Sequence, residues 1–219
     1  MKRPTELVPR KRPVQQRSKE TVEAILEAAG RVFASHGFAA GTSNRIAARA
    51  GVSIGSFYQY FPNKDAIVVA LMERHMAETT ATFEALKDLS DRVVMTVEDV
   101  VRHFVMALLN TYQQDPALFR VLFEEAPRPL GIHNTRAKIH EAVANALVPQ
   151  MGRLITAQLR DPLVSAHLLV EVATASVRHF VLHTPAGLKA ETFAEELIVM
   201  IVAYLVGPEP TMTPRSANP

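Results

Sequence analysis

The chain has 219 residues, 48% of them hydrophobic, with a formal net charge of +2 at pH 7 and no cysteine. This length allows one large domain or two small ones with true cores, and the cysteine count excludes disulfides, thiolate metal sites and cysteine nucleophiles. The basic N-terminus lacks the apolar segment of a secretory signal, and the apolar run 197–206 is shorter than the about 20 residues of a membrane span. A cytoplasmic location is therefore expected.

The charge is distributed unevenly. Residues 1–64 have a balance of +7 and residues 65–219 a balance of −5. A basic front on an acidic body predicts contact with a polyanion, although a basic tail that only aids solubility is the alternative. Three prolines predict that residues 1–17 form a flexible basic arm. The arm either reaches into a DNA minor groove or adds only salt-dependent attraction, through Lys2, Arg3, Arg10, Lys11 and Arg12.

Helical spacing of apolar residues begins at Ser18 and predicts a first helix that stops at Gly37. A second short helix, capped by Thr42 or Ser43, is expected to run to about residue 50. Gly51 then ends it and Ser53 caps a third helix.

The remaining chain also has helical periodicity. Asn63 is the expected N-cap of a long fourth helix, with Asp65 in its first turn. The predicted helices span residues 63–87, 96–114, 116–125, 134–160, 162–183 and 190–206. Pro149 should kink its helix, 126–131 should be a loop, and the tail 207–219 should be disordered. No strand and no internal repeat is predicted.

Two short helices joined at Gly51 predict a helix-turn-helix. With Phe57 facing inward and a rotation of about 100° per residue, part of the third helix also faces inward: Ser53, Ile54, Tyr60 and Phe61. The outward set is Gly55, Ser56, Tyr58 and Gln59. In the second helix, Ile46 faces inward and the outward set is Asn44, Arg45 and Ala48.

The outward face of the third helix is small, polar and uncharged, which suits the floor of a DNA major groove. The hydroxyls of Tyr58 and Tyr60 can reach phosphate oxygens, and Gly55 lets the backbone approach the ligand. Lys64 can pair with a phosphate as a point charge. A surface helix hairpin with no ligand remains the alternative.

Residues 18–70 resemble the TetR family of bacterial transcriptional regulators. The signature T-x-x-x-I-A-x-x-A-G-V-S-x-G-x-x-Y-x-Y-F-x-x-K is matched by Thr42, Ile46, Ala47, Ala50, Gly51, Val52, Ser53, Gly55, Tyr58, Tyr60, Phe61 and Lys64. The resemblance implies an all-α fold, with a three-helix DNA-binding domain over residues 18–62 and a larger helical ligand-binding and dimerisation domain over 63–206. The long basic arm departs from the pattern, since many members begin almost at the first helix.

The resemblance also implies roles for individual residues. Contacts with phosphates or base edges are expected from Thr42, Ser43 and Tyr58, and phosphate contacts from Tyr60 and Lys64. Ile54, Ser56 and Gln59 occupy variable positions that set operator preference, and Arg45 is included among the candidate DNA contacts because it faces outward. The family pairs its last two helices in a homodimer, so the operator should be an inverted repeat. The alternative is that both helices are internal to one subunit.

The acidic body is expected to hold a small, largely apolar inducer in a cavity between helices. Candidate lining residues are His103, Phe104, Met106, Tyr112, Phe119, Phe123, His140, Met151 and Arg178, although ordinary core packing is the alternative for each. Arg102, Arg120 and Arg178 would favour an anionic ligand, and Glu124, Glu125 and Glu171 a cationic one.

No cofactor and no metal site is predicted. His179 and His183 share a helix face but have no acidic third ligand nearby in the sequence. The chain has no nucleophile elbow, zinc-protease motif or phosphate-binding glycine loop, so an enzyme is not expected. The predicted function is a ligand-responsive transcriptional regulator, with repression as the family's commoner role. The alternative is an architectural DNA-binding protein without a ligand.

Overall fold

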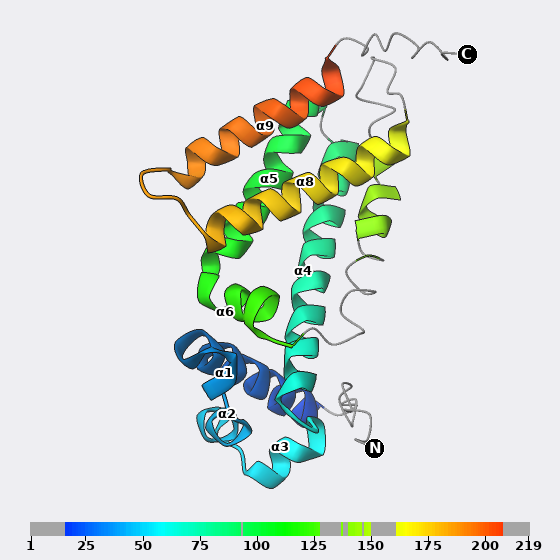
Figure 1. Cartoon of the computed structure of the whole chain (residues 1–219). Coiled ribbons are helices and arrows are strands. Elements are labelled where there is room, and N and C mark those ends of the chain that lie inside the picture. Colours follow the sequence, from blue (N-terminus) through cyan, green and yellow to red (C-terminus); the bar gives the residue numbers. More distant parts are fainter. Residues whose placement is uncertain are drawn as a thin grey trace, which may run out of the picture.

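The computed structural model describes residues 16–92, 94–127, 137, 140–145, 147–149 and 161–207, and every regular element in these ranges is helical (Figure 1). The elements are α1 (Gln16–Ala40), α2 (Ser43–Ala50), α3 (Ile54–Tyr60), α4 (Lys64–Arg92), α5 (Val97–Gln114), α6 (Pro116–Arg120), the π-helix η1 (Val121–Glu125), α8 (Pro162–Leu182) and α9 (Ala190–Val206). The all-α prediction is confirmed.

Helices α1, α2 and α3 form a compact head at one end of the molecule (Figure 1). Its core is closed by fully buried side chains: Ile25, Phe33, Ile46, Phe57 and Phe61. Helix α1 begins two residues before the predicted start. The predicted stop at Gly37 is confirmed for the main helix, because Gly37 has the non-helical angles φ 71° and ψ 172°. A short final turn follows it and ends at Ala40.

Helix α4 leads from the head into the body (Figure 1). The predicted N-cap is confirmed, because the Ala66 N–H donates to Asn63 Oδ1 at 2.8 Å. The helix continues to Arg92, five residues beyond the predicted end at residue 87. The head and the body are therefore joined by one continuous helix, and the predicted boundary at residues 62/63 remains a prediction.

The body is built on α5, which packs against both α8 and α9, while α6 and η1 lie between the body and α1 (Figure 1). The prediction of one regular helix over 116–125 is wrong in its second half. From Val121 the backbone widens into a π-helix, with the Ala126 N–H bonded to the Val121 carbonyl at 2.9 Å. No residue of this segment signals the wider turn in the sequence.

The last two helices match the predicted spans closely. In the predicted helix 134–160, residue 137 and residues 140–145 and 147–149 are helical, and the rest lies outside the described residues, as do residues 1–15 and 208–219. The predicted basic arm and tail, and the backbone after Pro149 that would reveal a kink, therefore stay untested. Among the described helices, none has the length and apolar character needed to cross a membrane.

Candidate DNA-binding surface and effector site

Helices α2 and α3 are joined by a turn at Gly51. Thr42 Oγ1 caps α2 by accepting the Arg45 N–H at 3.3 Å, and Ser53 Oγ caps α3 by accepting the Ser56 N–H at 3.0 Å. Gly51 has φ 68°, the left-handed conformation that favours glycine. Local sequence signals therefore determine both ends of the turn, and the predicted helix-turn-helix is confirmed.

The two faces of α3 differ as predicted. Phe57 and Phe61 are fully buried, whereas Tyr58 is 43% exposed and Gly55 and Gln59 lie on the same open side. A Cβ on Gly55 would meet nothing closer than 3.7 Å, so the glycine leaves open space rather than relieving a clash. The exposed face carries no charged side chain, and the space over Gly55 would let the base edges of a major groove come close to the helix backbone.

Two inward assignments for α3 are wrong. Ile54 is 40% exposed and Ser53 is exposed, because both lie at the first turn, where the cap directs the chain away from the core. Val52, in the turn, packs against the core instead. Ser56 and Tyr60 are half-buried at the edges of the open face. Ile54 thus joins the outer surface, as expected of a variable recognition position.

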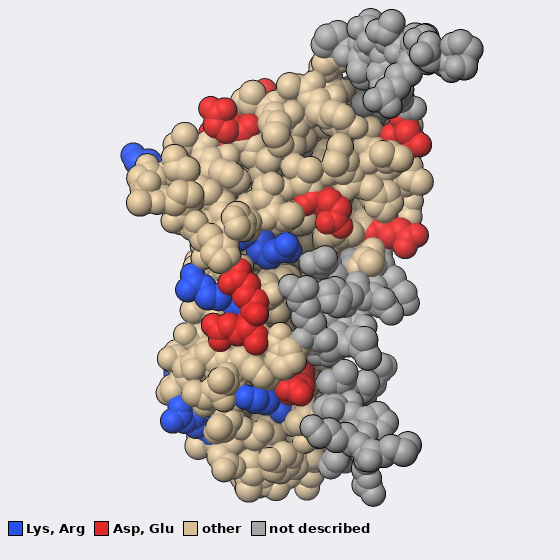
Figure 2. Space-filling model, viewed as in Figure 1, with Lys and Arg blue, Asp and Glu red and all other residues tan. Residues whose placement is uncertain are grey.

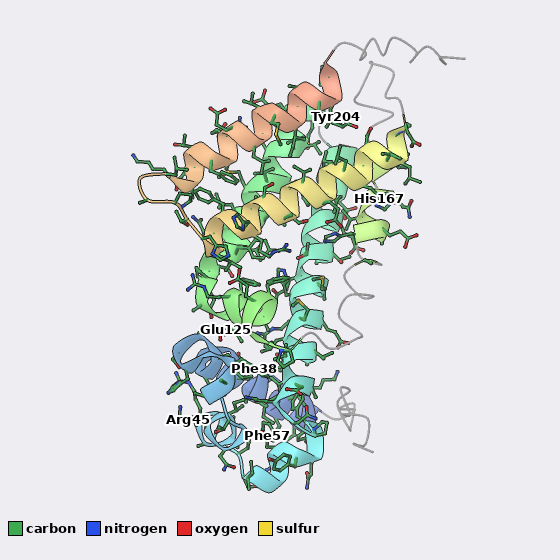
Figure 3. All side chains as sticks on the ribbon, in the orientation of Figure 1. Phe38, Arg45, Phe57, Glu125, His167 and Tyr204 are labelled. Atoms are coloured by element: carbon green, nitrogen blue, oxygen red, sulfur yellow. The ribbon has the colours of Figure 1, made fainter. Side chains whose placement is uncertain are left out.

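The N-terminal end of α2 adds to this surface. Thr42, Asn44 and Arg45 are exposed and Ser43 is half-buried. Figure 3 places Arg45 on the outer side of α2, where its guanidinium donates to the Ala40 carbonyl at 3.4 Å. The DNA contacts of these residues remain predictions.

Lys64 has an internal role that the sequence did not reveal. Its ammonium donates to the carbonyls of Phe38 at 2.7 Å and Ala39 at 3.2 Å, and it lies 4.0 Å from the centre of the Phe38 ring. These contacts tie the start of α4 to the end of α1. The predicted phosphate contact stays a prediction, but the ammonium already has two acceptors.

Replacing Lys64 with methionine is expected to lower the free energy of unfolding by about 1–3 kcal/mol, because two charge-assisted hydrogen bonds are lost. Urea denaturation measures this directly. Lys19→Met, which changes an exposed lysine of α1, should have no measurable effect. Unchanged stability with weakened DNA binding for Lys64→Met would instead assign the lysine to phosphate contact.

The head and the body also touch through η1. Glu125 Oε2 accepts the N–H of Phe38 at 3.0 Å, and both side chains lie at the junction labelled in Figure 3. The junction needs Gly37, because a Cβ there would lie 2.9 Å from Glu125 Oε2 and the residue has positive φ. The preceding residue, Glu124, bonds to His183 Nε2 at 2.6 Å. The π-helix therefore connects α8 to the head.

A cluster of aromatic rings occupies the centre of the body. His75 of α4 lies 4.7 Å from Phe119, 5.4 Å from Tyr112 and 6.0 Å from Phe123 between ring centroids. The guanidinium of Arg178 lies 4.8 Å from the centre of the Phe123 ring. Four elements, α4, α5, the α6–η1 segment and α8, meet at this cluster.

His75 is the unusual member of the cluster. It is only 5% exposed, and its Nδ1 has no hydrogen-bond partner among the described residues. Burial, helped by the nearby positive charge of Arg178, lowers the pKa of His75 from 6.5 to about 4. The imidazole is therefore neutral at physiological pH, and an unpaired polar atom faces a largely apolar centre.

Family models match both parts of the chain. Residues 25–71 match the model for bacterial regulatory proteins of the tetR family, and residues 96–205 match the tetracyclin repressor-like C-terminal domain. The chain belongs to the TetR family. Its members are helix-turn-helix transcriptional regulators, so the predicted family, fold and role in transcription regulation are confirmed.

Individual relatives agree with this assignment. An HTH-type transcriptional repressor of Mycobacterium tuberculosis is 32% identical over 173 residues, covering 73% of this chain and 88% of that protein. Nucleoid occlusion factor SlmA of Actinobacillus pleuropneumoniae is 29% identical over 122 residues. This match covers 56% of each chain, so the chain spans little more than half the length of SlmA.

Solved structures of TetR-family regulators share the fold. The fatty acid degradation regulator FadR of Bacillus halodurans has a TM-score of 0.67 at 18% identity, covering 91% of this chain and 98% of its own. SmeT, the repressor of the Stenotrophomonas maltophilia multidrug efflux pump SmeDEF, has a TM-score of 0.65 at 22% identity, with 91% and 98% coverage. At these identities the likeness concerns the fold alone.

The predicted lining residues of this TetR-family body separate into groups. Tyr112, Phe119, Phe123 and Arg178 come together around His75, as described above. His75 itself is not among the lining residues predicted from the sequence. Its position in the apolar stripe of α4, beside Leu71, Met72 and Met76, was the available signal.

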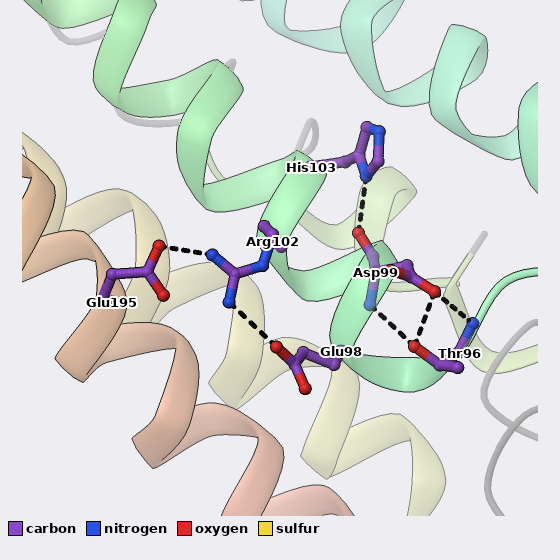
Figure 4. Close-up of polar contacts among 6 residues, drawn as sticks. All are labelled: Thr96, Glu98, Asp99, Arg102, His103 and Glu195. Carbon is purple, nitrogen blue, oxygen red and sulfur yellow. Dashed lines mark hydrogen bonds and ion pairs between the residues drawn. The ribbon is translucent and has the colours of Figure 1, made fainter.

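The other candidates lie elsewhere. Phe104 is buried and lines a small hollow beside α4. His103 and Met106 are both exposed, and His103 Nδ1–H donates to the Asp99 carbonyl at 2.7 Å (Figure 4), so their place in a cavity lining stays a prediction. Helical rotation explains the exposure of both, because their positions on α5 face away from the packed side. His140 Nδ1 lies 2.5 Å from a Glu171 carboxylate oxygen, and Met151 lies outside the described residues.

The histidine pair on α8 has an acidic neighbour that was not visible in the sequence. His179 and His183 have ring centroids 4.8 Å apart, and Glu124 bonds to His183. Nevertheless, no group of three potential ligands suited to a metal ion is found in the described part of the chain. The arrangement fits a hydrogen bond between Glu124 and the histidine at the end of α8.

An apolar surface covers α8 and α9. We call it the α8–α9 face, and its exposed members are Leu163, Val164, Leu168, Val199, Met200, Tyr204 and Val206. Figure 2 shows a broad uncharged area over these two helices, with acidic side chains at its margins. A shallow pocket with no polar lining opens in it between Leu168, Val172, Met200 and Tyr204. Leu168, Met200 and Tyr204 line this one pocket and are therefore contiguous, and a contiguous exposed apolar patch is typical of a protein–protein contact surface.

Proposed function

We propose that this protein is a cytoplasmic, dimeric repressor that binds an inverted-repeat operator through α3 and is released by a small-molecule inducer. The observation that best supports the proposal is the helix-turn-helix with an open, uncharged α3 face. The α8–α9 face would pair with the same face of a second copy. Two-fold symmetry would then place two α3 helices in successive major grooves.

The path from inducer to DNA is supported by the position of His75. This residue lies three turns along α4, whose first residue Lys64 is bonded to the head. A ligand that packs against the aromatic cluster would shift α4 and change the separation of the two heads. To release DNA, the ligand must bind the conformation whose head separation does not match the operator more tightly than the conformation that matches it. The coupling free energy between a ligand site and a DNA site is typically about 1–3 kcal/mol.

Selection of genomic fragments by the purified protein tests the DNA-binding part of the proposal. We expect enrichment of one inverted repeat. Gln59→Ala should then weaken binding by about 1–3 kcal/mol and relax the preference at one base pair in each half-site, because an exposed amide reads base edges. Fluorescence anisotropy with the selected repeat and its single-base variants measures both effects.

Gln113→Ala is the matched control, since Gln113 is an exposed glutamine of α5 far from the head along the chain. It should leave binding unchanged. Weak, sequence-independent binding that disappears with added salt would contradict the proposal that α3 recognises a specific operator sequence.

The similarity to SlmA, named as a nucleoid occlusion factor, favours one second candidate: an architectural DNA-binding protein without a ligand. A thermal-shift screen separates the two functions. A ligand-responsive repressor should be stabilised by small molecules that also release operator DNA, whereas an architectural protein should show neither effect.

A further inference from the structure

The charged side chains of the body can be sorted by their partners, and this sorting indicates the chemistry of the ligand. Two of the three candidate arginines are already paired. Arg102 bridges Glu98 and Glu195 (Figure 4), and these bonds hold α5 against α9. Arg120 donates to the Leu182 carbonyl at 2.8 Å. Neither guanidinium is available to a ligand without breaking a contact between helices.

The three candidate carboxylates are also occupied. Glu124 bonds to His183 at 2.6 Å, and Glu171 bonds to His140 at 2.5 Å. Glu125 accepts the Phe38 N–H at the junction with the head. A cationic ligand would therefore have to displace an existing partner from each of these acids.

Arg178 differs from all of them. Its half-buried guanidinium stacks on Phe123, and no carboxylate in the described ranges pairs with it. It lies close enough to His75 to influence the charge of that imidazole. Arg178 and His75 both contact the Phe123 ring, so a cation with no carboxylate partner among the described residues and an unpaired Nδ1 lie in one cluster. The guanidinium, and the imidazole in its Nδ1–H tautomer, can each donate a hydrogen bond to an oxyanion.

A small hollow of about 10 Å³ lies further along the α4–α5 seam, and an apolar ligand body would have to widen it by moving these helices apart. Thr79 lies one turn after His75 on α4, and the hollow opens there against Phe104, Leu108 and Thr111 of α5. The hydroxyls of Thr79 and Thr111 are bonded to backbone carbonyls of their own helices at 3.0 and 2.9 Å. The hollow therefore offers mainly carbon atoms, and His75, one turn before Thr79 on α4, is the nearest polar member of the cluster along that helix.

We propose that the effector is an organic anion with an apolar body, whose oxyanion is bound by Arg178 and by the Nδ1–H of His75 while the apolar body packs along the α4–α5 seam. This inference rests on the proposed function, because it names the ligand class of the same regulatory site. A neutral ligand would leave Arg178 without a counterion, and a cationic one would be repelled by it.

Matched probes test the ligand class on the full-length protein. The probes are 2-naphthoate with 2-naphthamide, octanoate with octanamide, and the cation 2-naphthylmethylammonium. Calorimetric titration and thermal shift should show that at least one acid binds more tightly than its amide. Arg178→Gln should remove that advantage, weakening the acid about tenfold or more while changing the amide less than about twofold.

Arg102→Gln is the control variant, because it removes an arginine of the same body that already has two acidic partners. It should leave the acid-to-amide preference unchanged. The proposed ligand class is wrong if no acid binds, or if every amide or the ammonium probe binds at least as well as the acids. These outcomes leave operator binding and the repressor proposal intact. If the protein selects no operator, the proposed function fails whatever the acids do.

Discussion

Replacing Met200 with lysine is expected to dissociate the protein into monomers and to weaken operator binding by about 10²-fold or more. Met200 is 53% exposed in the single chain and lines the pocket of the α8–α9 face. In a two-fold dimer each interface receives the new charge twice, without a partner, at a cost of about 3–5 kcal/mol. Analytical ultracentrifugation gives the assembly state, and anisotropy with operator DNA gives the affinity.

Met200→Leu is the matched control and should remain dimeric, since it preserves volume and apolar character. Because the side chain is exposed in the monomer, the lysine variant should keep its helical circular dichroism. A lysine variant that stays dimeric at micromolar concentration would place the interface on another surface.

Replacing His75 with phenylalanine is expected to remove a pH-dependent loss of stability. The native His75 has a pKa of about 4, against 6.5 for the ordinary side chain. Between these values the unfolded chain binds a proton that the native chain does not, so stability falls as pH decreases from 6.5 to about 4. The pKa shift corresponds to about 3 kcal/mol of unfolding free energy. This contribution is fully present above pH 6.5 and is fully lost once the pH has fallen below about 4.

Urea denaturation of both proteins at pH 8 and pH 4.5 isolates this contribution, because the other titrating groups cancel in the difference. At pH 8 the variant should be at least as stable as the wild type, since the unpaired Nδ1 is removed and the ring contacts are kept. His103→Phe, at an exposed position, should retain the wild-type pH slope. Equal slopes for wild type and His75→Phe would show that the imidazole is not buried in solution.

Local features of the head could be predicted because they depend on neighbours in the sequence. Thr42, Ser53 and Asn63 cap their helices as expected, and Gly37 and Gly51 have the positive φ that their stop positions require. Each signal acts over three or four residues, which is the range that a capping rule describes. The predicted inward and outward positions of the third helix are wrong only at its start, where Ser53 and Ile54 are exposed.

The aromatic cluster around His75 could be predicted only in part. Tyr112, Phe119, Phe123 and Arg178 were suggested by residue type, but nothing local shows that they meet around His75. A lone histidine in an apolar stripe resembles ordinary core, and only the tertiary packing reveals that its Nδ1 lacks a partner. Lys64 illustrates the same limit, because its acceptors lie 25 and 26 residues earlier in the chain.

The π-helix η1 imposes a constraint on chain length. Its neighbouring acids reach opposite ways, Glu124 to His183 of α8 and Glu125 to Phe38 of the head. Removing one residue from the wide turn would rotate everything after it by about 100° and shift both carboxylates away from their partners. Insertions and deletions within residues 121–125 should therefore be rare among homologues. The segment thus acts as a spacer of fixed length between the end of α8 and the head.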